Sequence, residues 1–206
     1  MQSADSGLAA KLRRITWTKL LRRAKRLVSR EAEERIFRIS AAEGKEFDLI
    51  PEFRMDCRDD MAKYVTQPGE SRDTVLADWS KRLDRGEHVL TRMEEGLLVT
   101  YGWIVERQKS CFLNDVDQSY EFPDGTAVIY DFFTVPEFRN REFYFQLLIH
   151  SVRTAAEFPG TEWIYLAALA DDPVPLWSVE RLGTEHCESL FYRRVLWFRK
   201  KWRTRP

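Results

Sequence analysis

The chain is poor in the residues that bind metals or form disulfide bonds. Its 206 residues include three cysteines and three histidines. Cys57, Cys111 and Cys187 are widely spaced and odd in number, so they show no zinc or disulfide framework and fit a reducing compartment. Asp171 and Asp172 have no histidine neighbours. We therefore expect no metal site.

The chain also lacks net charge. Lysine and arginine total 33, aspartate and glutamate total 33, and the formal net charge is +0. Any electrostatic attraction to a partner must therefore come from the distribution of the charges. Apolar residues make up 44% and aromatic residues 13%, which favours a packed globule over a disordered chain. The length suits one domain with a short extension.

The segment from Thr126 to Leu148 has the pattern of a strand, a turn and a helix. Its first part is β-branched and aromatic, and Pro136 ends the strand because it has no N–H for the ladder. A polar turn follows over residues 137–142. Apolar residues then recur at helical spacing, namely Phe143, Leu147, Leu148, Val152, Ala155 and Ala156. The free N–H groups at the start of such a helix, with arginines beside them, suit an anion such as phosphate.

These residues resemble the acyl-CoA-binding motif of the GNAT acyltransferase family. The family motif reads Val-x-Pro-Glu-x-Arg, then Gly-x-Gly-x-Gly/Ala, then a helix that begins with Leu-Leu. The matching residues are Val135, Pro136, Glu137, Arg139, Leu147 and Leu148. Asn140, Glu142 and Tyr144 stand at the three glycine positions. Glu142 either points into the site and opposes phosphate, or points outward as an acidic first-turn residue that the helix dipole favours.

A second block of the resemblance lies downstream. Residues 163–169 have the pattern of a buried strand, and an amphipathic helix follows with Leu176, Val179 and Leu182 on one face. The family pattern is a strand, Asn-x-x-Ala/Ser, a helix that ends in Lys-x-Gly-Phe, and a final strand. Asp172 stands at the Asn, Arg181 at the Lys and Gly183 at the Gly, while Thr184 replaces the Phe. The resemblance covers residues 88–198.

The resemblance implies a mixed α/β fold with a central, mostly antiparallel sheet flanked by helices. The sheet is expected to splay between the strand at 130–135 and the strand at 163–169. Local patterns predict a strand over 34–39, helices over 58–65 and 73–85, a hairpin of 88–92 with 97–106, a polar loop over 110–124, and a last strand over 190–197. Asp73 is expected to cap the second helix, and Gly86 is expected to end it.

The resemblance also assigns residues to acetyl-CoA, or to another acyl-CoA, as the co-substrate. The backbone of Phe133, Thr134 and Val135 would pair with the pantetheine arm. The pyrophosphate would be held by the turn and the helix start, that is, by Arg139, Asn140, Arg141, Glu142, Phe143 and Tyr144. Asp172, from the second block, is assigned to the same site.

Acyl transfer from a thioester to an amine requires a deprotonated amine, a polarised carbonyl and a proton for the thiolate. Asp131, on the central strand, is our candidate to bind or deprotonate the acceptor; the alternative is a structural strand-end aspartate. Tyr130 takes that place if the facing of the strand is offset by one residue. The family commonly uses a tyrosine on the last helix to protonate the sulfur, and Val179 stands there. Tyr192 and Tyr165 are the nearest substitutes in sequence.

Both ends of the chain are basic. Residues 8–28 combine apolar residues at near-helical spacing with many basic residues and Trp17, and charges interrupt any apolar run. We therefore divide the chain into a basic amphipathic N-terminal helix or extension, 1–30, and a GNAT-like domain, 31–206. The extension lies in the interface of an anionic membrane, or it packs on the domain or on a partner. It has no secretory-signal pattern.

The C-terminal end places basic residues around Trp197, Phe198 and Trp202. Such a composition suits a membrane interface, and it also suits nucleic acid. Since no nucleic-acid-binding motif accompanies it, we rank lipid headgroups above nucleic acid.

The function that the sequence favours is an acyl-CoA-dependent N-acyltransferase, in the first place an acetyltransferase, in the cytoplasm or peripherally at the inner membrane surface. The acceptor would be a small-molecule amine or an amino sugar of envelope polysaccharide assembly. The alternative is a non-catalytic binding or scaffold protein that kept the fold, because the glycines are replaced and the helix tyrosine is absent. A homodimer is compatible with either.

Overall fold

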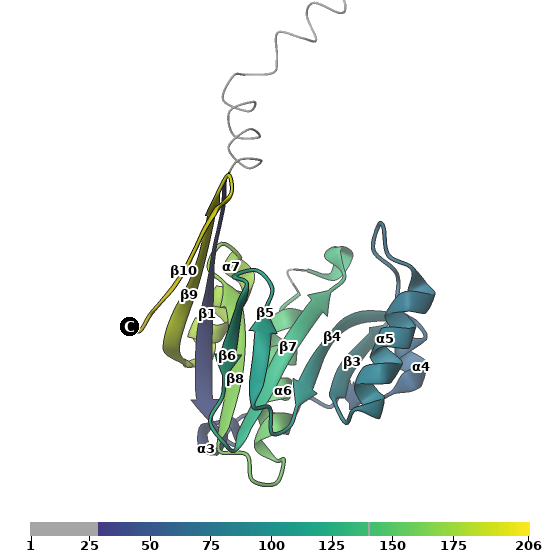
Figure 1. Ribbon diagram of the computed structural model, residues 1–206. Helices are drawn as coiled ribbons and strands as arrows, with labels where there is room; N and C mark the ends of the chain where they lie inside the picture. The colour runs from purple at the N-terminus through teal and green to yellow at the C-terminus, as the bar shows by residue number, and fades with distance from the viewer. Residues whose placement is uncertain (1–28, 140) are drawn as a thin grey trace, which may run out of the picture.

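The computed structural model describes residues 29–139 and 141–206, and its centre is an eight-stranded sheet (Figure 1). From one edge to the other the strands are β10 (Phe198–Thr204), β9 (Glu185–Val195), β1 (Ser29–Ser40), β8 (Trp163–Leu169), β7 (Thr126–Thr134), β4 (Leu97–Val105), β3 (His88–Glu94) and β2 (Phe53–Met55). β7 and β8 run parallel, and the other neighbours run antiparallel. The mixed α/β fold with a mostly antiparallel sheet is confirmed.

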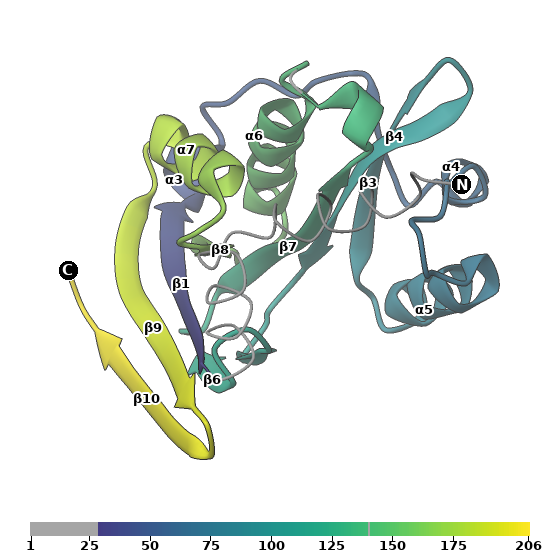
Figure 2. The ribbon, with the colours of Figure 1, turned by 90° about the horizontal axis from the view of Figure 1, so that it is seen from above.

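One face of the sheet is covered by α3 (Ala41–Gly44), α6 (Phe143–Ala156) and α7 (Pro173–Leu182), as Figure 2 shows from above. Leu147 and Val152 of α6 and Val179 of α7 are completely buried there, against strand residues that include Ile164. These are the residues whose helical spacing predicted the two helices. Burial of such a side chain contributes about 1.5–3 kcal/mol, so this apolar face is what fixes α6 on the sheet.

The other face is covered in part by α4 (Arg58–Met61) and α5 (Arg72–Asp84), which lie over β3 and β4. Tyr64, Trp79 and Trp103 are buried in one aromatic cluster there. The helix predicted over 58–65 is shorter than expected: after Met61 the backbone forms i to i+3 hydrogen bonds, which turn Tyr64 into this cluster. Asp73 is not the cap of α5, because Ser71 stands at that position and Asp73 lies in the first turn.

The polar loop predicted over 110–124 is wrong, since the structure forms a hairpin of β5 (Ser110–Leu113) and β6 (Gln118–Glu121). The many polar residues of the segment gave it the composition of a loop. Its half-buried residues nevertheless alternate with exposed ones, as they do in strands. Leu113 and Tyr120 pack under the hairpin against Tyr165 of β8, and Val116 in its turn is completely buried. The hairpin therefore covers the part of the sheet that α4 and α5 leave open.

β7 and β8 separate along their length. Their pairing is limited to Thr126 with Trp163, Ala127 with Ile164 and Val128 with Tyr165. Beyond Val128, in the described part of the chain, each strand lacks a ladder partner on the edge that faces the other. The predicted splay is thereby confirmed, and it opens toward the carboxyl ends of both strands, where α6 and α7 begin.

β1 fills the position between β8 and β9, and it is longer than the strand predicted over 34–39. The domain boundary predicted after residue 30 falls inside this strand, and residues 1–28, which carry the predicted basic helix, lie outside the described residues. At the other end of the chain the strand predicted over 190–197 is present as β9, but it ends two residues earlier and a further strand, which was not predicted, follows it. β9 ends at Val195, and a two-residue turn of Leu196 and Trp197 leads into β10. The cause is the positive φ of Leu196, 55°, which reverses the chain.

Candidate active site

A bulge in β7 sets the direction of the central side chains. Trp103 of β4 pairs with Tyr130 and Tyr101 pairs with Phe133, so Gly102 alone faces two residues, Asp131 and Phe132. Asp131 takes the extra place with a φ of 51°. As a result Tyr130 and Asp131 both line one cleft. The two side chains that the sequence offered as alternatives for the facing of this strand therefore line the same cleft.

Gly102 makes the bulge possible. Phe132 turns to the opposite face of the sheet, where it packs against Leu147's cluster and forms a ring contact with Tyr144 at 5.7 Å. A Cβ on Gly102 would lie 2.4 Å from the ring of Phe132. Only glycine allows this approach without a shift of the aromatic ring or the strand.

The cleft lies where β7 and β8 separate, on the face that carries α5 and the hairpin. It has a volume of about 510 Å³. Apolar side chains form most of its wall, namely Ile36, Val105, Phe112, Leu113, Phe122, Val128, Ile129, Leu166 and Ala167. Three carboxylates also line it: Glu34, Glu87 and Asp131. The cleft is thus an apolar chamber with acidic groups and an opening between the two parallel strands.

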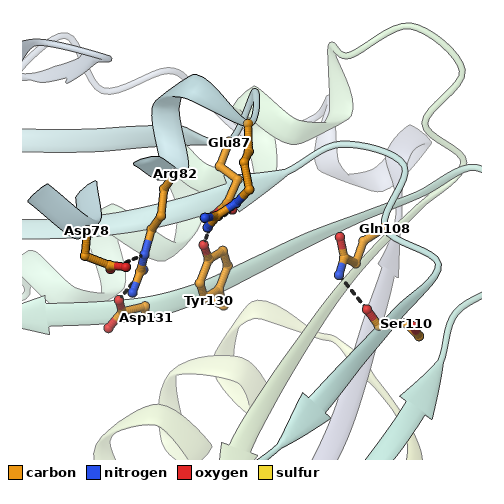
Figure 3. A network of polar contacts seen from close by, with 8 residues as sticks. Asp78, Arg82, Glu87, Gln108, Ser110, Tyr130 and Asp131 are labelled. Carbon is orange, nitrogen blue, oxygen red and sulfur yellow. Dashed lines mark hydrogen bonds and ion pairs between the residues drawn. The ribbon is translucent and has the colours of Figure 1, made fainter. Parts of the chain in front are cut away.

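Asp131 is held by an arginine. Its Oδ2 accepts a hydrogen bond from Nη1 of Arg82 at 2.6 Å, and Nε of Arg82 also donates to Asp78 at 2.8 Å (Figure 3). The guanidinium lies over the ring of Trp103, 5.0 Å from its centroid. Arg82 therefore fixes the direction of the Asp131 carboxylate at the edge of the cleft.

Tyr130 donates its hydroxyl hydrogen to Glu87, and Figure 3 shows the two side chains pointing toward each other. Burial, with the Glu87 hydrogen bond adding to it, raises the pKa of Tyr130 above its ordinary value. Tyr130 therefore stays protonated at neutral pH and can serve as a donor, while Glu87 is already engaged.

Glu34 is a cleft residue that the sequence analysis missed. It lies on β1 opposite Leu169 of β8, and its Oε2 is buried with no hydrogen-bond partner among residues 29–139 and 141–206. Burial, followed by the charge of Asp115, raises the pKa of Glu34 to about 7. A signal was present in the sequence: Glu34 lies two residues from Ala32 and two from Ile36. In a strand these three side chains point to the same face, and Ala32 and Ile36 face the core.

The start of α6 carries the residues assigned to the pyrophosphate. Glu142 is the N-cap with a φ of 59°, the left-handed backbone that a glycine adopts readily, and its side chain makes no capping bond. Its carboxylate lies 3.1 Å from Nη1 of Arg181 on α7. Glu142 thus points outward to a cation. Arg139 and Arg141 are exposed beside it, and Asn140 lies outside the described residues.

The other residues assigned to acyl-CoA gather at the same end of the sheet. Phe143 is buried at the first turn of α6. Burial, with the nearby charge of Asp172 adding to it, raises the pKa of Tyr144. Asp172 caps α7, since its Oδ1 accepts from Val174 N–H at 3.3 Å. Asp172, at the start of α7, and Arg181, in its last turn, therefore both lie near the start of α6.

The strand backbone assigned to pantetheine is divided between two edges. Val135 N–H donates to Val99 at 2.9 Å, and Thr100 Oγ1 donates to the carbonyl of Phe133 at 2.7 Å, so both face β4. Because backbone groups alternate along a strand, those of Thr134 face the opening, where its carbonyl accepts from Arg139 at 3.2 Å.

Tyr192 is not brought together with these residues. It is buried on β9, two strands beyond β8, in the cluster under the hairpin. Tyr165 belongs to the same cluster, and Val179 is buried under α7. In the described part of the chain no cluster of three or more histidine, cysteine, aspartate or glutamate side chains has the arrangement of a metal site.

The fold is shared with solved acetyltransferase structures. The acetyltransferase from the GNAT family of Colwellia psychrerythraea matches with a TM-score of 0.58 and 8% identity over 87% of this chain and 63% of that chain. A GCN5-related N-acetyltransferase from Sphaerobacter thermophilus matches with a TM-score of 0.51 and 14% identity over 93% and 58%. A conserved protein of unknown function from Staphylococcus epidermidis matches with a TM-score of 0.56 and 14% identity over 85% and 65%.

At these identities the shared property is the fold. The match spans less than two thirds of the length of each of these three structures. No family model matches the chain, and no curated protein matches it in sequence.

Proposed function

We propose, from the GNAT fold that this chain shares with those structures, that the protein is an acyl-CoA-dependent N-acyltransferase. The observation that carries the proposal is the separation of β7 and β8. At its open end lie the first turn of α6 and exposed arginines, and on the opposite face of the sheet lies an acidic cleft. Ligands of sheets with parallel strands bind at the carboxyl ends of such strands, where neighbouring connections diverge.

The acyl-CoA side has groups that fit a pyrophosphate. The first-turn N–H groups of α6 have no partner within the helix, and the helix dipole favours an anion there. Arg139 and Arg141 add positive charge. Glu142 opposes an anion less than its position suggests, because Arg181 neutralises its carboxylate. The thioester would pass between the separated strands, beside the backbone of Thr134.

The acceptor side has groups that fit an amine. The cleft meets β7 at Tyr130 and Asp131, where the thioester would emerge. We propose that Asp131, held in place by Arg82, orients the acceptor amine, and that the hydroxyl of Tyr130 is a proton donor on the same wall. The reaction is direct transfer of an acyl group, in the first place acetyl, from sulfur to nitrogen.

The acceptor would be a small-molecule amine, and a cytoplasmic location is part of the same proposal. The amino sugar of envelope polysaccharide assembly, which the sequence favoured, stays a prediction. The mostly apolar lining of the cleft favours a less polar molecule.

Peripheral binding to an anionic membrane is a second candidate property, and the β9–β10 turn supports it. Trp197 is 77% and Phe198 72% exposed, and Leu196 holds a left-handed backbone that bulky residues rarely adopt. Such turns ordinarily contain Asn-Gly. Basic residues surround the tip, namely Arg193, Arg194, Arg199, Lys200 and Lys201. No helix in the described residues is long and apolar enough to cross a bilayer.

The test of the enzymatic proposal is release of free CoA thiol from acetyl-CoA in the presence of primary amines. Amine-dependent release supports it. The absence of both acyl-CoA binding and thiol release favours the scaffold alternative, in which the fold is kept without the chemistry.

A further inference from the structure

Glu34 differs from the other acids of the cleft in having a buried oxygen without a partner. Asp131 is paired with Arg82, and Glu87 is bonded to Tyr130 and to Arg85, 2.6 Å away. Oε2 of Glu34 is buried and has no hydrogen-bond partner in the part of the chain that the structure describes, while Glu34 itself lines the cleft. A buried, unpaired carboxylate oxygen destabilises the fold, so a ligand that donates to it regains that free energy.

Glu34 lines the same cleft as Tyr130 and Asp131. Glu34 pairs with Leu169 on β8, two residues beyond Ala167, which lines the opening between the strands. Counting from the last β7–β8 pair, Val128 with Tyr165, Leu169 lies as far along β8 as Phe132 lies along β7. Glu34 and Asp131 therefore lie at about the same level of the cleft, on its two sides.

The surroundings of Glu34 determine which donor fits. A cationic ammonium group satisfies a carboxylate more strongly than a neutral donor does. The remaining wall offers mostly aliphatic and aromatic side chains, such as Ile36, Phe112 and Phe122. A ligand that matches both features is an ammonium group on an apolar or aromatic body.

We infer that Glu34 binds the ammonium group of the acceptor and removes its proton, and that the acceptor is a primary amine with an apolar or aromatic body. This inference rests on the proposed acyltransferase function. It adds a proton acceptor and a substrate class to the orienting role of Asp131.

The proton balance of the step is complete. Glu34 takes one proton from R–NH₃⁺, and the free amine attacks the thioester carbonyl as the carbon–sulfur bond breaks. The hydroxyl of Tyr130 donates a proton to the thiolate of CoA and regains one from the nitrogen. The products are the amide, CoA thiol and one proton, which Glu34 returns to solvent.

Glu34 accepts a proton only when it is ionised, so the reaction should depend on pH. The pKa of Glu34, raised to about 7 by its burial, means that the ionised form is lost below neutrality. Titratable and charged groups face this side from every element packed around Glu34. They include Arg30 on the same strand, Tyr165 on β8, Cys187, Glu188 and Tyr192 on β9, Cys111, Asp115 and Tyr120 on the hairpin, and Glu87 and Asp131 across the cleft. We expect kcat/KM to fall as the pH decreases below about 7, since this parameter reports the base of the free enzyme.

The experiment compares the full chain with Glu34→Gln and with Glu31→Gln as the matched control. Glu31 lies three residues away on β1, is exposed, and pairs with Arg193 outside the cleft. Thiol release from acetyl-CoA is measured with tryptamine, hexylamine, spermidine and glucosamine from pH 5.5 to 9. Calorimetry measures the binding of acetyl-CoA, and separately that of tryptamine without acetyl-CoA.

The expected result is that tryptamine and hexylamine react faster than glucosamine. Glu34→Gln then lowers kcat/KM by about 10²- to 10⁴-fold, removes the fall below pH 7, and weakens tryptamine binding while the Kd of acetyl-CoA is unchanged. Glu31→Gln matches the parent chain.

A preference for glucosamine overturns the substrate class. Equal rates and equal tryptamine binding in Glu34→Gln and the parent overturn the role of Glu34, and so does an absence of tryptamine binding to the parent. Failure of the acyltransferase proposal is separate, since it shows as a loss of acetyl-CoA binding in all three proteins.

Discussion

Arg181 on α7 lies 3.1 Å from the carboxylate of Glu142, the residue that begins α6. Its guanidinium also lies 4.0 Å from the ring centroid of Phe145 and 4.9 Å from that of Trp177, so the arginine is fixed between the two helices. Both partners are largely exposed, and such a pair contributes at most about 1 kcal/mol to stability. Its main effect is to remove the charge that Glu142 would present to a phosphate.

Arg181→Ala should therefore weaken acetyl-CoA binding, because it leaves the Glu142 carboxylate unpaired at the helix start. Glu142→Gly should strengthen binding, since glycine adopts the left-handed backbone and carries no charge. A charge beside a helix terminus is worth about 0.3–1 kcal/mol, which corresponds to a change of about two- to fivefold in Kd in each direction. Arg153→Ala, which removes an arginine near the other end of α6, is the control. An equal change in the Kd of acetyl-CoA in all three variants would show that the Arg181–Glu142 pair has no specific effect on binding.

Asp131→Asn should lower turnover by at least about tenfold and leave the Kd of acetyl-CoA nearly unchanged, because the side chain faces the acceptor cleft and not the start of α6. The control is Asp78→Asn, which removes the other carboxylate bonded to Arg82 but lies on α5 outside the cleft. Steady-state kinetics with the amine that reacts fastest measures the turnover of both variants. Equal turnover in Asp131→Asn and the parent would exclude Asp131 from the mechanism.

Gly102→Ala should destabilise the fold by about 1–3 kcal/mol, the usual effect of overpacking a core. The added methyl group would lie 2.4 Å from the Phe132 ring. Urea denaturation measures the change in the free energy of unfolding. Adding Phe132→Leu should recover part of the loss if this contact is its cause, and an unchanged loss in the double variant would point to the strand backbone instead.

Glu34 should make the stability of the chain decrease as the pH rises. The pKa of Glu34 in the folded chain, about 7, lies above its ordinary value of 4.5. Between these values the folded state keeps a proton that the unfolded chain releases, so the free energy of unfolding falls with increasing pH across this window. Glu34→Gln should therefore gain stability relative to the parent between pH 4.5 and 7, and keep the gain above pH 7. A difference that does not vary with pH would show that Glu34 ionises normally in the folded state.

Exchange of the exposed tip, Trp197→Ser with Phe198→Ser, should reduce sedimentation of the protein with anionic vesicles, because these aromatic side chains are those available to enter the interface. Lys200→Gln with Lys201→Gln tests the electrostatic part, which is about 1 kcal/mol per basic residue. Neutral vesicles are the control. Equal sedimentation of parent and variants would assign any membrane binding to another part of the chain.

Much of the fold was predictable because the signals were local. The helical spacing of Leu147 and Val152 predicted α6. The Glu95-Gly96 pair predicted the turn between β3 and β4, and both residues have a positive φ in the structure. The two blocks that resemble the GNAT motif predicted the separation of β7 and β8. Each of these features depends on residues close together in the chain.

The rest depends on contacts between distant residues. No local pattern places β1 between β8 and β9, because that pairing joins residues more than a hundred positions apart. The bulge at Asp131 depends on Gly102 in another strand. The spacing of Glu34 from Ala32 and Ile36 indicates only that its side chain faces the core, and Glu34 becomes a cleft residue when the distant hairpin folds over β1.

Calorimetric titration of the full chain with acetyl-CoA and with a longer acyl-CoA, at modest ionic strength, tests the central claim most directly. If the protein is an acyl-CoA-dependent enzyme, at least one of them binds at micromolar concentration, and Glu142→Gly binds it more tightly. Absence of binding to both the parent and Glu142→Gly would contradict the acyltransferase function and leave a GNAT fold used as a scaffold.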